Sequence, residues 1–270
     1  MTIVRRFLDV GGPCLCCVDF GGSGSSVLLL HGLAGRGNEW RSTADWLTRR
    51  AHVFALDQRG HGISERTPGN YTRDAYVSDA IQVIERLGIA PVILIGQSMG
   101  GINAFLVAVH RPELVRALIV VEASARPNPA AVPGVQKWFA SWPLPFPTLA
   151  DARRFFGGET LYAQTWIEIL QERPDGYWPQ FDREDMLGSI EDLATHDYMD
   201  EWASIGCPTL VVGGANSFVA QEDLQEMARR IPRGQYVQLA DAGHDLHLEQ
   251  PEAWCRAVEA FLNELDAERQ

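Results

Sequence analysis

The sequence has no long hydrophobic run and few basic residues. No apolar stretch in its 270 residues approaches the roughly 20 residues that a membrane helix needs. The N-terminal stretch MTIVRRFLDVGG also lacks the continuous apolar segment of a secretory signal. Lys and Arg number 23 against 35 Asp and Glu, so the formal net charge is −12, and this sign repels phosphate backbones and anionic lipids. We therefore expect a cytoplasmic protein that binds neither nucleic acid nor membrane surfaces.

The cysteines are too few and too irregular for a disulfide framework. There are five of them, an odd number in a long chain, which fits a reducing compartment. Cys14, Cys16 and Cys17 are clustered, but zinc ligands usually come as spaced pairs followed by a second pair or by histidines. No such second set follows, so we expect these cysteines to be small apolar residues of a β-strand. The sequence indicates neither a metal nor a cofactor.

The bulk composition is that of an ordinary globular protein, with 46% hydrophobic and 21% charged residues. A length of 270 residues allows one large domain, or one domain that carries an insertion. The sequence does not distinguish a monomer from a homodimer.

Short apolar runs alternate with stretches of helical length, a pattern that predicts an α/β fold with a mostly parallel sheet and helices on both faces. A GGP turn joins the first two runs, so those two strands should be antiparallel. Helices are predicted near residues 40–50, 73–87, 99–110, 221–231 and 251–266. The eight predicted strands are Ile3 to Asp9, Leu15 to Phe20, Val27 to Leu30, Val53 to Asp57, Val92 to Gly96, Leu118 to Glu122, Leu210 to Gly213 and Tyr236 to Leu239.

The alternation stops between residues 123 and 206. The first part of this segment is rich in proline, with Pro127, Pro129, Pro133, Pro143 and Pro145 among its residues, and the rest is typical of several short helices. The segment holds 13 of the 25 aromatic residues. We predict a helical cap inserted into a core domain made of residues 1–122 and 207–270. Trp138, Trp142 and Trp166 are candidates for an apolar substrate pocket under that cap. The alternative is that these rings only pack the insertion.

Ser98 is the candidate nucleophile. The segment Gly96-Gln97-Ser98-Met99-Gly100 matches G-x-S-x-G, follows the apolar run VILI and precedes a helical stretch. This is the strand-turn-helix context of a nucleophile elbow, in which side chains two positions before and after the serine would collide. The alternative is an ordinary helix N-cap.

The loop after Leu30 begins His31-Gly32-Leu33. Such a loop can direct a backbone N–H at a developing oxyanion, together with the N–H of the residue after the nucleophile. The predicted donors are therefore Leu33 and Met99, and His31 is expected to hold the loop.

Seven histidines compete for the role of general base. His244 lies in a loop between the last predicted strand and the last helix, at the sheet edge expected for Ser98. Imidazole suits this role because its pKa lies near neutrality. For His247 we expect a structural role with satisfied hydrogen bonds.

In this order, the segments HGLAG, LDQRGHGIS, GQSMGG, PTLVVGG and DAGHDLHLEQPEAW resemble the α/β-hydrolase superfamily. The resemblance extends over nearly the whole chain apart from residues 123–206. It implies the same roles for Ser98, His244, Leu33 and Met99.

One departure from the family pattern concerns the acid of the triad. In much of the superfamily it follows the strand that here ends at Gly213, yet the next loop has Asn216 and no carboxylate before Glu222 and Asp223. The preceding strand ends in Glu122, and a carboxylate there is costly without a partner. We therefore predict Glu122 as the acid. Three alternatives stay open: Asp223, Glu222 and Asp241.

These residues predict a serine hydrolase that cleaves a carboxylic ester or lactone of an apolar small molecule through an acyl-enzyme. Within enzymes, the alternatives are hydrolysis of a carbon–carbon bond in a diketone-like substrate and a proline-type aminopeptidase. A catalytically silent, ligand-binding protein is the alternative from another class.

Overall fold

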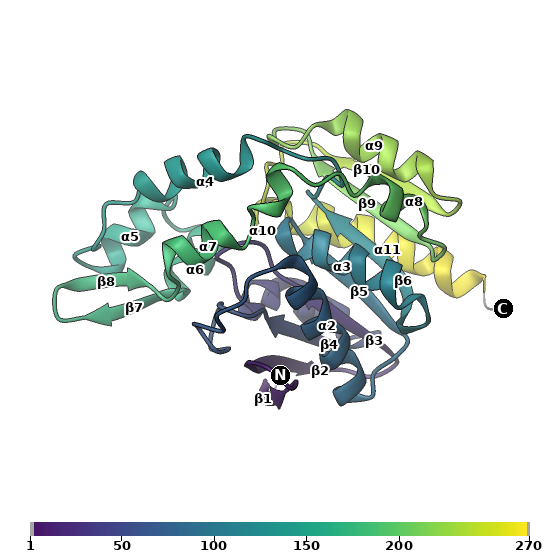
Figure 1. Cartoon of the computed structure of the whole chain (residues 1–270), viewed down its shortest axis with the longest axis horizontal. Coiled ribbons are helices and arrows are strands. Elements are labelled where there is room, and N and C mark those ends of the chain that lie inside the picture. Colours follow the sequence, from purple (N-terminus) through teal and green to yellow (C-terminus); the bar gives the residue numbers. More distant parts are fainter. Residues whose placement is uncertain (1–2, 269–270) are drawn as a thin grey trace.

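A computed structural model describes residues 3–268 of the chain. Within these residues, eight strands form one sheet in the order β1-β2-β4-β3-β5-β6-β9-β10 (Figure 1). β2 pairs antiparallel with β1 and β4, and all other neighbours are parallel. The predicted fold class is confirmed. The strands of this sheet are β1 (Val4–Asp9), β2 (Cys14–Gly21), β3 (Ser25–Leu30), β4 (Ala51–Asp57), β5 (Val92–Gln97), β6 (Val115–Val121), β9 (Thr209–Gly214) and β10 (Gly234–Leu239).

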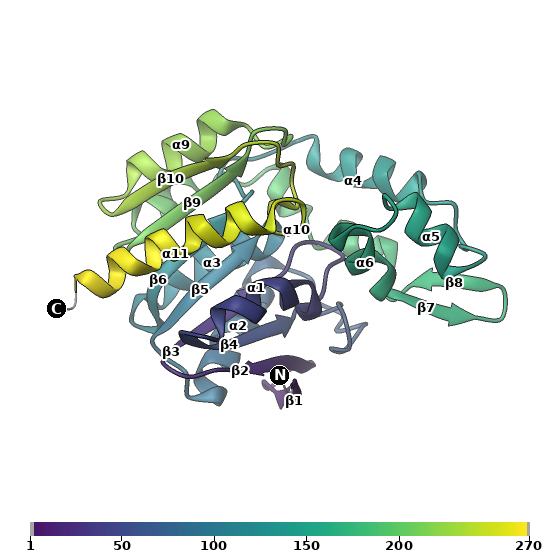
Figure 2. The ribbon, with the colours of Figure 1, turned by 180° about the vertical axis from the view of Figure 1, so that it is seen from behind.

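Helices cover both faces of the sheet, as Figures 1 and 2 show from opposite sides. One face carries α2 (Arg73–Leu87), α3 (Met99–His110), α8 (Met199–Ala203) and α9 (Gln221–Arg230). The other carries α1 (Arg41–Leu47) and α11 (Pro251–Ala267), with the short helices η1 (Gly37–Trp40) and α10 (Leu246–Glu249) near them. A further short helix, η2 (Pro112–Leu114), precedes β6. The predicted strands and core helices are all present, with ends that differ by no more than three residues.

The central strands are apolar throughout because both of their faces are buried. In β3, Leu28 and Leu30 belong to the apolar cluster on one face, and Val27 and Leu29 belong to the cluster on the other. Each such side chain contributes about 1.5–3 kcal/mol when fully buried. The sheet is therefore a rigid base, and the carboxyl ends of its parallel strands are fixed relative to one another.

Residues 123–206, called the insert from here on, follow β6. The part from α4 (Ala131–Ala140) to α7 (Arg183–Gly188) projects from one end of the sheet, and α8 returns to the face of the sheet (Figures 1 and 2). The insert has its own apolar cluster, separate from the two clusters of the sheet. Besides α4, α7 and α8, it contains α5 (Leu149–Phe155), α6 (Leu161–Glu168), β7 (Leu170–Arg173), β8 (Gly176–Pro179) and η3 (Asp192–Ala194). The predicted core domain also included residues 1–2 and 269–270, which lie outside the described residues.

The expectation of short helices alone was incomplete, because β7 and β8 form an antiparallel hairpin. Pro174 and Asp175 make the connection, and Gly176, the first residue of β8, has a φ of 135°, which residues with a side chain rarely adopt. A Pro-Asp-Gly sequence is a strong turn signal. This signal was available in the sequence, but the two four-residue strands are too short to give a clear alternation.

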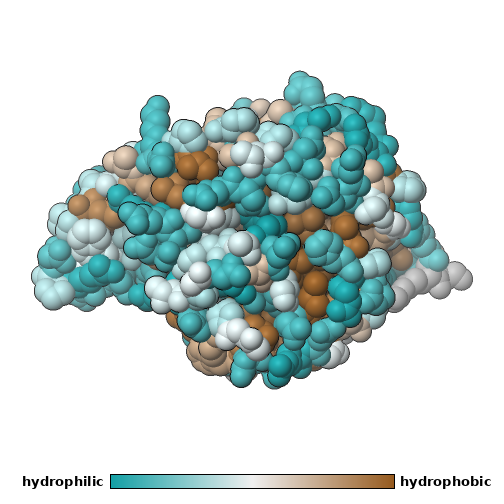
Figure 3. Space-filling view, viewed as in Figure 1, coloured by the Kyte–Doolittle hydropathy of each residue, from teal (hydrophilic) through white to brown (hydrophobic). Residues whose placement is uncertain are grey.

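The surface in Figure 3 is mostly hydrophilic, with separate apolar groups. Among the described residues, six large hydrophobic side chains are exposed, and Phe218 is the most exposed of them, at 74%. No helix within residues 3–268 is both long enough and apolar enough to cross a membrane.

Candidate active site

Ser98 occupies the sharp turn between β5 and α3. Its backbone has a φ of 52° and a ψ of −121°, an uncommon conformation that costs a residue with a side chain about 1–3 kcal/mol. The glycines two residues before and after Ser98 are required because there is no room for a side chain at either position. A Cβ at Gly96 would collide with the carbonyl group of Gly100, and a Cβ at Gly100 would collide with that of Leu30. The turn can form because neither position carries a side chain. Ser98 is half-buried and lies at the carboxyl edge of the sheet.

Glu122 directly follows β6, and its side chain is fully buried. Its Oε2 atom lies 3.2 Å from Nδ1 of His244 and also accepts a hydrogen bond from the hydroxyl of Ser217. Its Oε1 atom accepts a 2.6 Å hydrogen bond from the backbone N–H of Gly214. These donors offset the cost of burying a carboxylate. A carboxylate on Nδ1 also favours the tautomer in which Nε2 of His244 is free to accept a proton.

The other candidate acids lie elsewhere. Asp223 forms an ion pair with Arg126 at 3.2 Å, and Glu222 and Asp241 are exposed. Within residues 3–268, none of these three carboxylates hydrogen-bonds to His244. The structure thus brings only Glu122, among the acids considered from the sequence, to the imidazole.

Gln97, the residue before Ser98, holds the loop that carries His244. Its Nε2 atom donates a 3.0 Å hydrogen bond to the carbonyl oxygen of His244 and a 3.3 Å hydrogen bond to Oδ1 of Asp245. No hydrogen bond joins Ser98 to His244 in the part of the chain that the structure describes. Catalytic hydrogen bonds are often long without substrate and tighten when it binds.

His31 organises the loop that follows β3. Its Nδ1 atom lies 2.7 Å from the carbonyl oxygen of Gly32, and its Nε2 atom accepts a 3.0 Å hydrogen bond from the backbone N–H of Gln58. These partners require a neutral ring with the proton on Nδ1. Burial lowers the pKa of His31 to about 4, which keeps the ring neutral. His31 therefore holds residues 31–35 in place, and these residues are called the oxyanion loop from here on, after the role predicted for them.

The oxyanion loop lies against Ser98. A Cβ at Gly32 would lie 3.4 Å from Cβ of Ser98, and Leu33 is the next residue. Met99 is the first residue of α3, so its N–H belongs to the first turn, where backbone N–H groups have no partner within the helix. The two predicted donors are thus carried by segments on either side of Ser98.

The three predicted pocket tryptophans lie in the apolar cluster of the insert. Trp142 and Trp166 are buried, and Trp138 is half-buried. The ring of Trp138 lies 5.1 Å from each of the other two in edge-to-face contacts. Of the three, Trp166 lines a small cavity of about 10 Å³ that also touches the oxyanion loop. Trp138 and Trp142 pack behind it. Leu33 and Ala34 of the oxyanion loop join the same cluster.

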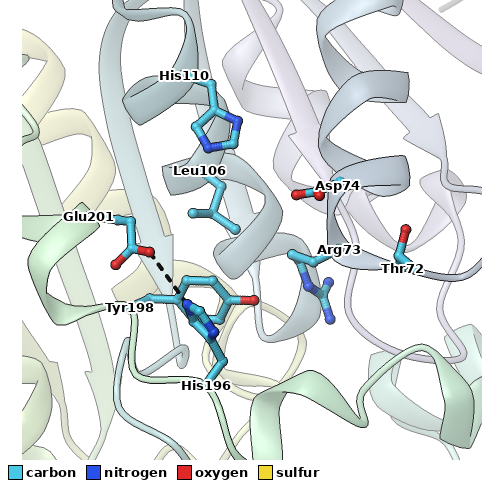
Figure 4. A pocket seen from close by; sticks show the side chains of 8 residues that line it. All are labelled: Thr72, Arg73, Asp74, Leu106, His110, His196, Tyr198 and Glu201. Atoms are coloured by element: carbon cyan, nitrogen blue, oxygen red, sulfur yellow. Dashed lines mark hydrogen bonds and ion pairs between the residues drawn. The ribbon is translucent and has the colours of Figure 1, made fainter.

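A larger cavity of about 300 Å³ lies away from these residues (Figure 4). Arg73, Asp74, His196, Tyr198 and Glu201 are among the side chains around it. The Nε2 atom of His196 lies 3.4 Å from Oε1 of Glu201. Neither Ser98, Glu122 nor His244 lines this cavity.

Sequence reasoning missed three residues near the site. Gln97 and Ser217 hold His244 and Glu122, as described above. Phe218 follows Ser217, and its exposed ring lies 4.4 Å from the ring of His244. Of these three, only Gln97 had a signal in the sequence, because it is next to the candidate nucleophile Ser98. Ser217 and Phe218 lie in a loop whose path depends on the neighbouring strands.

His247 differs from the expectation of satisfied hydrogen bonds. It is fully buried, and neither ring nitrogen hydrogen-bonds to a described residue. Burial lowers its pKa to about 4, so the ring is neutral. Its ring stacks on Trp40 with 4.3 Å between centroids.

Comparison with known proteins gives a consistent family match. The family model described as alpha/beta hydrolase fold matches residues 25–251. The sn-1-specific diacylglycerol lipase ABHD11 of Danio rerio is 29% identical, over 90% of this chain and 80% of the lipase. The (E)-2-((N-methylformamido)methylene)succinate hydrolase of Acinetobacter baylyi is 28% identical, over 89% of this chain and 91% of that enzyme.

Among solved structures, an E-2-(acetamidomethylene)succinate hydrolase superposes with a TM-score of 0.87. The match covers 97% of this chain and 100% of that one, with 22% sequence identity. At this identity the likeness concerns the fold alone.

Proposed function

The chain belongs to the alpha/beta hydrolase fold family, and we propose that it is a serine hydrolase that cleaves a carboxylic ester or lactone of an apolar small molecule. The observation that carries this proposal is the contact between buried Glu122 and Nδ1 of His244, at the same sheet edge as the elbow that presents Ser98. An acid, a base and a nucleophile in this arrangement support acyl transfer through a covalent intermediate.

In the proposed reaction, Oγ of Ser98 forms a bond to the carbonyl carbon of the ester while Nε2 of His244 takes the hydroxyl proton. The N–H groups of Leu33 and Met99 stabilise the resulting oxyanion. The C–O bond of the ester then breaks, and the leaving alcohol receives the proton from His244. Water attacks the acyl-enzyme in the same way, which releases the carboxylic acid and restores Ser98. Glu122 stays ionised and stabilises the imidazolium at each step.

We also propose that the insert is a cap that selects the substrate. Leu33 and Ala34 pack into its aromatic cluster. In addition, the guanidinium group of Arg36 donates a 2.7 Å hydrogen bond to the carbonyl oxygen of Glu168 at the end of α6. The aromatic rings of the insert and the exposed ring of Phe218 favour an apolar acyl or alcohol group.

Turnover of p-nitrophenyl acetate or butyrate and covalent labelling test the proposal together. We expect the protein to hydrolyse these esters. We also expect an organophosphonate to attach one phosphonyl group to Ser98 and to abolish that hydrolysis, because the serine is activated. Peptide mass spectrometry locates the label. An active preparation labelled at another residue, or not labelled, would exclude Ser98 as the nucleophile.

A second experiment tests the cap. Among the three predicted tryptophans, Trp166 lines the cavity beside the oxyanion loop. Trp166→Ala should therefore change the ranking of short against long acyl esters by about tenfold in kcat/KM, the equivalent of roughly 1–2 kcal/mol. Trp178→Ala is the matched control, because Trp178 lies on the β7–β8 hairpin, where it hydrogen-bonds to Asp175. Equal losses on all esters that follow the melting temperature alone would mean that Trp166 only packs the insert.

A further inference from the structure

Glu39 is a buried carboxylic acid that the proposed reaction does not use. It lies in η1, just after the oxyanion loop, and is 7% exposed. Its Oε2 atom accepts a 3.3 Å hydrogen bond from the backbone N–H of Arg36. A Cβ at Gly35 would collide with this same oxygen. The carboxyl group thus fills the inner side of the oxyanion loop, where only a glycine leaves room for it.

The other side of this carboxyl group faces the segment that carries His244. The Oε1 atom of Glu39 lies 3.5 Å from Nε2 of His247. The small cavity beside Trp166 is lined by Glu39 and Asp245 together with residues of the oxyanion loop. Gln97 belongs to the same group of residues, since it also lines the cavity and donates a hydrogen bond to Asp245. Glu39 is therefore wedged between the two segments that must hold the oxyanion donor and the base in register.

We propose that Glu39 is a positioning residue, whose uncharged carboxyl group braces the oxyanion loop against the segment from His244 to Glu249. This inference rests on the proposed function, because a position for the N–H of Leu33 matters only if an oxyanion forms there. Glu39 acts through the loop and does not touch the reacting atoms.

The groups around Glu39 determine the pH at which its carboxyl group loses its proton, and so the pH range in which it can hold the loop. Burial is the largest effect, and together with the nearby carboxylate of Asp57 it leaves the pKa of Glu39 raised to about 8. The backbone N–H groups of Arg36 and Gly32, and the charge of Arg36, lower the pKa by less. The guanidinium group of Arg36 is engaged with Glu168 of the insert.

The segment from His244 to Glu249 supplies no strong cation to Glu39. Burial lowers the pKa of His247 to about 4, so this ring is neutral when Glu39 titrates. Asp245 faces Glu39 as a second acid, and Glu249 lies beyond Asp245. The charges of Glu39 and Glu249 each raise the pKa of Asp245. When Glu39 loses its proton above about pH 8, a buried negative charge therefore faces other acids. The repulsion should displace the oxyanion loop and lower kcat.

Glu39→Gln tests this directly, because glutamine keeps the size and an acceptor oxygen but cannot ionise. The wild type should lose kcat for p-nitrophenyl butyrate by about tenfold per pH unit above about pH 8, with little change in KM, while Glu39→Gln should keep its plateau to about pH 10. Glu252→Gln, an exposed change on α11, is the matched control and should behave as the wild type. The same alkaline decline in Glu39→Gln would overturn the proposal.

A second measurement does not depend on turnover. The native state holds the proton of Glu39 up to about pH 8, but an unfolded glutamic acid loses its proton near pH 4.3. Between these values the native state binds more protons than the unfolded state, so this group lowers stability as pH rises. The melting temperature of Glu39→Gln should therefore gain on the wild type between about pH 5 and about pH 8 and then run parallel to it.

A constant difference in melting temperature between about pH 5 and about pH 8 would show that folding does not raise the pKa of Glu39, and would overturn the proposal even if the protein hydrolyses no ester. Should Glu39→Gln fail to fold, Asp245→Asn decides. It removes a negative charge that faces Glu39, so it should move the alkaline decline to lower pH, and an unchanged midpoint would contradict the brace.

Discussion

Glu122→Gln should reduce kcat for p-nitrophenyl butyrate by about 10⁴-fold and leave KM nearly unchanged. The substitution keeps the shape of the side chain but removes the charge that stabilises the imidazolium of His244. It also places an amide beside Nδ1, which can reverse the tautomer that the base requires. Steady-state kinetics measures the effect, and circular dichroism checks that the fold survives.

Asp223→Asn is the matched control, because Asp223 is one of the two carboxylates that come next after the following strand, where much of the family has its acid. Asp223 pairs with Arg126, so we expect less than about a tenfold change in kcat. If Glu122→Gln keeps nearly full kcat while Asp223→Asn or Glu222→Gln abolishes it, the acid lies on the later loop.

A carboxylate introduced at position 216 should recover part of the lost rate in the Glu122→Gln background. The backbone N–H of Asn216 donates a 2.8 Å hydrogen bond to the carbonyl oxygen of Ala242, two residues before His244. Asn216→Asp therefore places a charge on the loop beside the base. A rate that stays at the level of Glu122→Gln would mean that this loop cannot orient the imidazole.

Ser98→Ala should lower kcat by about 10⁶-fold, because no other group can form the acyl-enzyme. Substrate binding should persist, since the oxyanion loop and the insert are unchanged. Single-turnover experiments with p-nitrophenyl butyrate measure the loss, and the Ser124→Ala variant serves as a control on the loop after β6. A Ser98→Ala variant that retains substantial turnover would reject the proposed mechanism.

Ser98→Gly should lose the same activity and yet unfold at a higher temperature than Ser98→Ala. The residue at this position has a φ of 52°, which glycine adopts without strain, so the expected gain is about 1 kcal/mol. Thermal unfolding compares the two variants. An equal or lower melting temperature for Ser98→Gly would mean that the elbow carries no such strain.

The fold could be predicted because its signals are local. Strands buried on both faces are apolar along their whole length, so β3, β5, β6 and β9 are visible without any knowledge of their neighbours. The signal for the elbow is local as well, because Ser98 needs glycines two residues before and after it, and these glycines can be recognised directly in the sequence. The hairpin of β7 and β8 was missed because strands of four residues show too little periodicity.

The partners within the site could be predicted only in part. Glu122 and His244 are 122 positions apart, and the sequence left four acids in competition. The strand order decides among them, because β6 lies beside β9 and so brings Gly214 and Ser217 to the carboxylate. Nothing in a loop that reads Asn-Ser-Phe indicates that its serine bonds to a residue on another strand.

The sequence by itself determined the class of sheet, the sharp turn that carries the proposed nucleophile and the loops that surround it, because each depends on neighbouring residues and on steric rules of the backbone. Only the tertiary structure decided which acid contacts His244, which tryptophan reaches the oxyanion loop, and that Glu39 lies buried behind that loop. Those properties depend on burial and on contacts between distant segments. Burial sets the charge of a carboxyl group, and a sequence does not record which side chains the fold removes from water.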